Sequence, residues 1–166
     1  MTAAAIAHGT VPFPVGETHG SEFTALDALL GEEFQGTKGK VYRLVKADAT
    51  VASPAKRCFK RASAGSDTVT LTTGATESVC GVAVADQVAL TAGDYFFVQV
   101  AGEVSLIEKS GQTVASDDYI LPEANGEVKP SGSTTSTTFS VLFPALCHTE
   151  SSGAVTAYLV YKLWGL

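Results

Sequence analysis

From Lys40 onward the sequence is a succession of short apolar and β-branched runs separated by turn residues, with no helical pattern between them. Many short strands without alternating helices are typical of an antiparallel sheet packed or closed on itself. The expected strands are 41–46, 69–72, 79–84, 95–100, 103–108, 119–121, 139–146 and 157–163. Glycines that we expect at turns separate them, including Gly74, Gly81, Gly93, Gly102, Gly111, Gly126, Gly132 and Gly153. The sequence therefore predicts an all-β fold, a small antiparallel β-barrel or sandwich.

The first 22 residues sustain neither a helical nor a strand period, and prolines at positions 12 and 14 favour extended backbone. We interpret this segment as an extended N-terminal arm. Its apolar residues indicate docking on a partner, for which another copy of the chain is one candidate: Ile6, Val11, Phe13 and Val15. A loose terminus is the alternative reading.

One short helix is expected after the arm. Phe23, Leu26, Leu29 and Leu30 recur on one helical face, and Gly31 is a candidate helix end. We therefore divide the chain into an arm and helix over residues 1–37 and a β-rich domain over residues 38–166.

Charge is segregated along the chain. Residues 1–37 hold five acidic residues and no lysine or arginine, residues 38–61 hold eight lysines and arginines and one acidic residue, and the remainder holds eleven acidic residues and three lysines. The basic segment can pair with its own chain, with a neighbouring copy or with an acidic external surface, or it can be a solvated strand face. Within it, cations crowd around Cys58 and Phe59, which predicts a contact site at Lys56, Arg57, Lys60 and Arg61. The net charge of −6 disfavours nucleic acid as a partner.

Compartment and chemistry are constrained mainly by what the sequence does not contain. Three cysteines cannot all pair, so reduced buried thiols are expected. No apolar run approaches the ~20 residues that span a bilayer, and the start of the chain lacks the pattern of a signal peptide, which favours a cytoplasmic product and no membrane partner.

No catalytic, cofactor-binding or metal-binding residues are assigned, and we expect no enzyme. The histidines lack zinc-ligand spacing, and neither a phosphate-binding glycine motif nor a nucleophile elbow occurs. Cys147 and His148 are adjacent, and neighbouring strand residues point to opposite faces. Asp94, Asp117 and Asp118 are read as turn formers.

The chain ends in an apolar strand followed by Trp164. Apolar residues occupy both faces of this strand, so it is either core within one subunit or part of a contact between subunits. Tryptophan is enriched at protein interfaces, and Trp164 is therefore included among the candidate contact residues.

Turn and strand motifs from residue 41 to the end resemble those of the capsid cement, or head decoration, proteins of tailed bacteriophages. The motifs are Gly81-Val82-Ala83, Gly93-Asp94-Tyr95, the strand Val98–Val104, the turn Val114–Asp117, the hairpin Asn125-Gly126-Glu127-Val128, the Ala145-Leu146 step and the strand Ala157–Leu163. Ser116 replaces the usual glycine.

The resemblance implies a non-enzymatic virion protein, made in the host cytoplasm, that binds the major capsid protein on the outer capsid surface. It implies a homo-oligomer, with a trimer favoured, that stabilises the head by bridging capsomers. Two alternatives remain. A carbohydrate or host-surface binding module would gather Tyr42, Tyr95, Phe96 and Phe97 on one exposed face, and an enzyme would gather His148 with carboxylates in a pocket.

Overall fold

The computed structural model describes residue 27 and residues 29–115, 118–131, 145–151 and 154–159. The arm and most of the expected helix lie outside these residues. So do five of the expected contact residues: Ile6, Val11, Phe13, Val15 and Trp164.

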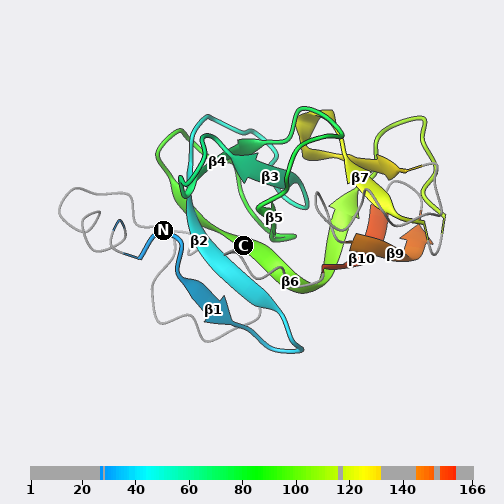
Figure 1. Cartoon of the computed structure of the whole chain (residues 1–166), viewed down its shortest axis with the longest axis horizontal. Helices are drawn as coiled ribbons and strands as arrows, with labels where there is room; N and C mark the ends of the chain where they lie inside the picture. Colours follow the sequence, from blue (N-terminus) through cyan, green and yellow to red (C-terminus); the bar gives the residue numbers. More distant parts are fainter. Residues whose placement is uncertain (1–26, 28, 116–117, 132–144, 152–153, 160–166) are drawn as a thin grey trace.

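Nearly all the described elements are β-strands (Figure 1). They are β1 (Glu33–Gln35), β2 (Val41–Ala47), β3 (Cys58–Arg61), β4 (Thr68–Leu71), β5 (Gly81–Ala83), β6 (Tyr95–Ile107), β7 (Ile120–Pro122), β8 (Val128–Pro130), β9 (Ala145–Ser151) and β10 (Ala154–Leu159), with the 3₁₀ turn η2 (Ala124–Gly126) before β8. The main sheet has the order β1-β2-β4-β3-β5-β6-β10-β9, and a further β2–β6 pairing closes β2, β4, β3, β5 and β6 into a five-stranded barrel.

The predicted all-β fold is confirmed, in its barrel form. One pairing departs from the antiparallel prediction, because β2 and β4 are parallel and meet only at Lys46↔Thr68 and Ala47↔Val69. The expected ranges did not include β1, β3 and β8, and the expected range 139–146 overlaps β9 only at residues 145–146.

Strand β6 is a single strand where the sequence predicted two strands and a turn at Gly102. Its first part pairs with β2 and β5 inside the barrel, and its second part pairs with β10 outside it. Gly102 has a φ of +86°, and a Cβ there would lie 3.0 Å from the Gly39 carbonyl oxygen. Nearby, the register with β2 shifts between Val41 and Tyr42, as at a β-bulge. Gly102 therefore marks a bend inside a strand. The turn expected there from the glycine was wrong, whereas the continuous strand Val98–Val104 implied by the resemblance is present.

The bend is fastened by a buried side chain. The Gln99 amide donates hydrogen bonds to the carbonyl oxygens of Ala101, at 3.0 Å, and Glu103, at 2.8 Å. Gln99 is only 4% exposed, so these bonds also satisfy its buried donor group.

Two cores lie on opposite sides of the barrel wall. The barrel interior holds Phe59 and Phe96, whose rings meet edge to face at 5.0 Å, together with Val45, Val69 and Val98. The second core lies under the later part of β6, β7, β8 and β10, and contains Leu106, Val114, Ile120, Val128 and Val155. Cys58 faces this second core from the barrel wall while its neighbour Phe59 faces the interior, as alternation along a strand requires.

A third apolar cluster covers the outside of the barrel. Tyr42, Leu44 and Phe97 point outward from β2 and β6, each 3% exposed. They are covered by a segment that we call the strap, namely Asp27 and residues 29–35, through Leu29, Leu30 and Phe34. A turn over Thr37–Lys40 joins the strap to β2, and the division expected at residues 37 and 38 falls within this turn.

An added methyl group at Gly126 should be costly, because part of what it would meet is backbone. Its φ is +72°, and a Cβ would lie 2.8 Å from both the Arg57 Cβ and the Cys58 carbonyl oxygen. We expect Gly126→Ala to lower the free energy of unfolding by about 2–4 kcal/mol, combining backbone strain with overpacking. Gly111→Ala is the matched control, because Gly111 has a φ of +79° but open space around it. Denaturant unfolding that gave equal losses for the two variants would contradict the steric part of this expectation.

Candidate contact surface

Most of the basic segment is neutralised by the chain's own acidic residues. Five of its eight cations form ion pairs: Arg43 with Glu33, Lys46 with Asp27, Arg57 with Glu127, Lys60 with Glu77 and Arg61 with Asp67. Of the alternatives that the sequence left open, pairing within the chain therefore accounts for most of this charge.

Three of the four expected contact cations have side-chain partners, and these partners differ. Arg57 donates hydrogen bonds to the Ser53 carbonyl oxygen, at 2.8 Å, and to the Asn125 carbonyl oxygen. These bonds join the segment before β3 to η2. Arg61 faces the same side of the sheet as Val69, its register partner, and meets Asp67 at 3.5 Å. Lys56 has no ion-pair partner among the residues that the structure describes.

These pairings remove the argument from crowded charge that led to the predicted contact. Arg57, Lys60 and Arg61 are held by acidic side chains of their own chain. The contact itself stays a prediction, and Lys56 is the member of the four whose charge is available for a partner.

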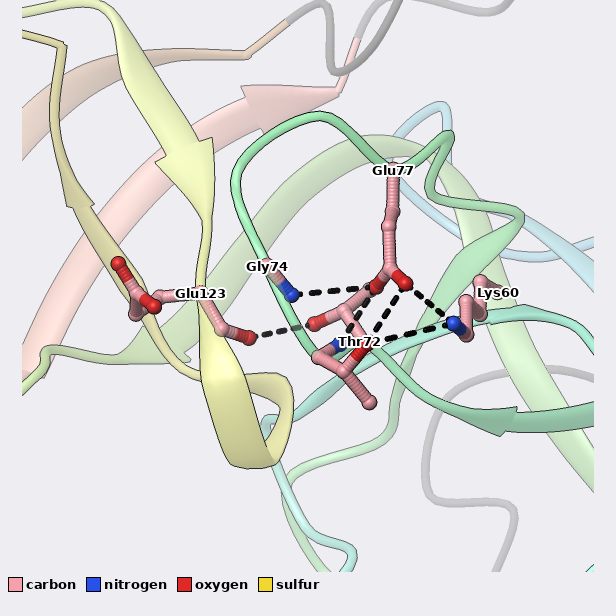
Figure 2. A network of polar contacts seen from close by, with 6 residues as sticks. Lys60, Thr72, Gly74, Glu77 and Glu123 are labelled. Atoms are coloured by element: carbon pink, nitrogen blue, oxygen red, sulfur yellow. Dashed lines mark hydrogen bonds and ion pairs between the residues drawn. The ribbon is translucent and has the colours of Figure 1, made fainter.

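Glu77 is the centre of the network shown in Figure 2. Its carboxylate accepts hydrogen bonds from the Lys60 ammonium, from the backbone N–H groups of Thr73 and Gly74, and from the Thr73 hydroxyl. Partial burial opposes ionisation of Glu77, but the Lys60 and Thr73 hydrogen bonds outweigh it and lower the pKa to about 2. The carboxylate thus fixes the loop that follows β4.

A second network joins that loop to the β7–β8 hairpin. The Thr72 hydroxyl donates to the Glu123 carbonyl oxygen at 2.8 Å (Figure 2). The Glu123 carboxylate pairs with Lys129 and, at 3.4 Å, with Lys109. The Lys129 hydrogen bond, followed by that from the Ala124 N–H, lowers the pKa of Glu123 to about 2.

An open hollow of about 380 Å³ lies beside Glu77. Its lining is Lys60, Arg61, Ala62, Ser63, Ala64, Glu77, Ser78 and Cys80. Lys60 and Arg61 are already ion-paired, and burial raises the pKa of the Cys80 thiol to about 12, which keeps it protonated and unreactive. This lining has the character of a structural ion-pair network.

Asp94 and Asp118, which lie in the described part of the chain, are turn formers, as predicted. The Thr91 N–H donates to the Asp94 carboxylate at 2.7 Å, and the Ala115 N–H donates to the Asp118 carboxylate at 2.8 Å. In both turns the aspartate N–H also donates back to the carbonyl of the same partner residue. Asp117 lies outside the described residues.

Cys147 and His148 lie on β9, but strict alternation does not hold there. Thr156 is opposite Thr149 while Ala157 is opposite Cys147, so His148 is the extra residue of a β-bulge. The side chains of Cys147 and His148 lie outside what the structure describes, so their expected orientation to opposite faces stays a prediction.

The aromatic residues required by the carbohydrate hypothesis do not form an exposed face. Tyr42, Phe96 and Phe97 are buried, and Tyr95 is half-buried and bonded through its hydroxyl to Asp27 and Lys46. Within the described part of the chain, the exposed large apolar side chains are Val88 and Tyr158. The carbohydrate hypothesis therefore loses the residues on which it depended.

The described ranges contain neither a metal-ligand cluster nor a membrane-spanning helix. No group of three histidine, cysteine, aspartate or glutamate side chains is arranged as metal ligands are. No helix among the same residues is both long enough and apolar enough to cross a bilayer.

Comparison with known proteins finds a likeness in structure alone. No protein-family model matches the sequence, and no curated protein matches it. Among solved structures, the N base of the head fibre gp8.5 of bacteriophage phi29 is similar, with a TM-score of 0.52 and 20% sequence identity. The chain shares its fold. The match covers 76% of this chain and 99% of the fibre base, so the whole base is represented here.

The Glu77 network predicts a pH-dependent contribution to stability. Because folding lowers the Glu77 pKa from 4.5 to about 2, its stabilisation is present above pH 4.5 and is lost as the pH falls toward 2. We expect Glu77→Gln to lower the free energy of unfolding at pH 7 by about 1–2 kcal/mol, after allowance for solvent screening of the pair.

Denaturant unfolding at several pH values measures this effect. The difference between Glu77→Gln and the native chain should shrink as the pH approaches 2. Glu103→Gln is the control, because Glu103 is exposed and forms no ion pair with any described residue. A loss for Glu77→Gln that was equally large at acidic pH would show that the carboxylate charge is not its cause.

Proposed function

We propose that this protein is a structural component of a tailed-phage virion that binds the outer surface of the head. The observation that carries the proposal is the barrel fold shared with a phage head-fibre base, whose whole length the match covers. The turn motifs of the cement proteins, found over the same β-rich region, support the same class of protein independently of that comparison.

The contacts of the described residues are consistent with a protein that acts through its surface and through the symmetry of its oligomer. The large networks around Glu77, Glu123 and Arg57 join segments of this chain to one another. Such networks rigidify a small barrel, and a rigid subunit binds at lower entropic cost than a flexible one.

We propose that the working form is a homo-oligomer, with a trimer favoured, that bridges subunits of the major capsid protein. A closed symmetric oligomer presents the same contact several times, and each further contact forms at a high effective concentration. Weak individual contacts are then sufficient for stable decoration of the head.

A second candidate is the anchor of a fibre on the head, favoured by the fibre base that shares this fold. The two functions differ in their effect on the shell. Cement must raise the resistance of the head to heat or chelator, whereas an anchor binds without changing it.

One experiment tests the proposal and separates these candidates. Purified protein is added to undecorated mature heads and to immature shells of the phage from which the chain derives, and both bound protein and heat-induced DNA release are measured. Saturable binding to mature heads supports the virion role, and delayed DNA release identifies cement. Absence of binding to either shell would overturn the proposal.

Lys56 provides a test of the predicted contact that leaves the fold intact. Lys56→Glu should weaken head binding and reduce its dependence on salt, because a cation at a charged contact is replaced by an anion. Lys38→Glu is the matched control, since Lys38 is also cationic, has a similar positive φ and has no ion pair among the described residues. Equal binding by the two variants would remove Lys56 from the contact.

The arm is tested by deletion. Removing residues 1–20 should lower head occupancy or oligomer stability, because the apolar residues Ile6, Val11, Phe13 and Val15 are lost. Occupancy and oligomer mass are measured by quantitative electrophoresis of decorated heads and by light scattering. If both are unchanged, the arm is not a docking segment.

A further inference from the structure

The strap covers a face of the barrel that must always be covered. Tyr42, Leu44 and Phe97 form an apolar outer wall, and Phe34 packs edge to face on Phe97 with ring centroids 5.4 Å apart. Exposed contiguous apolar surface promotes association, so this wall needs an occupant in every state of the protein.

The contacts of the strap are transferable between copies of the chain. The Gly31 N–H donates to the Leu44 carbonyl at 2.9 Å, and the Leu44 N–H donates to the Glu32 carbonyl at 3.1 Å. Strand β1 adds its pairing with β2. None of these contacts involves the hinge, residues 36–40, so the same contacts form whichever copy supplies the strap.

Charge complementarity shows which segment fits against β2. The strap carries acidic side chains, and β2, against which it packs, carries cations. Glu33 pairs with Arg43, and Asp27 pairs with Lys46. The chain has no lysine or arginine before position 38, and residues 38–61 hold eight. An acidic strap and the basic side chains of β2 therefore attract each other whether they belong to the same copy of the chain or to two copies.

The hinge is short and contains backbone strain. Lys38 has a φ of +57° and Gly39 a φ of +70°, and the Lys40 N–H closes the turn on the Thr37 carbonyl at 3.2 Å. Positive φ is unfavourable for lysine, and short strained hinges favour exchange of the segment that they carry. Extended, five residues span roughly 17 Å, which lets the strap leave its own barrel.

We propose that the strap is exchanged between copies in the free oligomer, so that Asp27 and residues 29–35 of one copy cover the outer wall of the barrel of the next. This inference rests on the oligomer of the proposed function. Exchange retains the strap contacts and releases the turn at Lys38, and it makes each barrel incomplete without its neighbour.

The ion pairs of the native chain allow a direct test. Isotopically light and heavy proteins are mixed in the unfolded state and refolded, and a zero-length carbodiimide then joins carboxylates to amines that already touch. The Lys46 ammonium lies 3.4 Å from the Asp27 carboxylate, so this pair reports on the strap. The Lys60–Glu77 pair, within the barrel, is the internal control.

Exchange predicts Asp27–Lys46 links that join a light peptide to a heavy one, while Lys60–Glu77 links join peptides of one label. Asp27–Lys46 links of one label only would overturn the proposal. Because heads are absent from this experiment, that result leaves the proposed function standing, whereas failure to bind heads leaves the cross-links unaffected.

A hinge variant provides the second measurement. Lys38→Gly removes the strain in the turn, so it should lower the mixed-label fraction of Asp27–Lys46 links relative to the native chain. Lys40→Gly changes a neighbouring lysine outside the two positive-φ positions and serves as its control. A mixed-label fraction that fell equally in both variants would show that hinge strain does not drive exchange.

Discussion

The continuous, bent strand β6 is the feature on which the rest of the structure depends. Its first part closes the barrel by pairing with β2, and its second part pairs with β10 and covers the second core. The bend is possible because Gly102 has no side chain where the backbone of Gly39 and Lys40 approaches, and because Gln99 satisfies the carbonyls on both sides of the bend. A turn at this point would have produced two separate strands and no continuous wall between the two cores.

Ion pairs attach the strap and several loops to the barrel. Acidic residues from several distant segments meet the basic segment: Asp27 and Glu33 come from the strap, Glu77 from the loop after β4, and Glu127 from between η2 and β8. Three of these pairs join the strap or a loop to a barrel strand, and the fourth, Arg57 with Glu127, joins the residue before β3 to the residue before β8. The charge segregation seen along the sequence is therefore largely cancelled in space, and the cations that remain available define a much smaller candidate surface.

The contacts that these charged groups already make limit the functions that the structure supports. The hollow beside Glu77 is lined by groups already engaged in structural contacts, and the aromatic side chains suited to sugar binding are largely inside the protein. These contacts support the proposed structural role better than the carbohydrate-binding alternative. The fold shared with a head-fibre base is the observation on which that proposal rests.

The sequence by itself determined the fold class, because short strands and glycine turns are encoded locally in the period of apolar residues. It also determined the turn role of Asp94 and Asp118, since an aspartate bonds to backbone only a few residues away. Only the tertiary structure decided that Gly102 bends a strand, that β2 and β4 run parallel, and that Arg57, Lys60 and Arg61 already have acidic partners. Those outcomes depend on which distant segments come together when the barrel closes, and local patterns contain no record of that pairing.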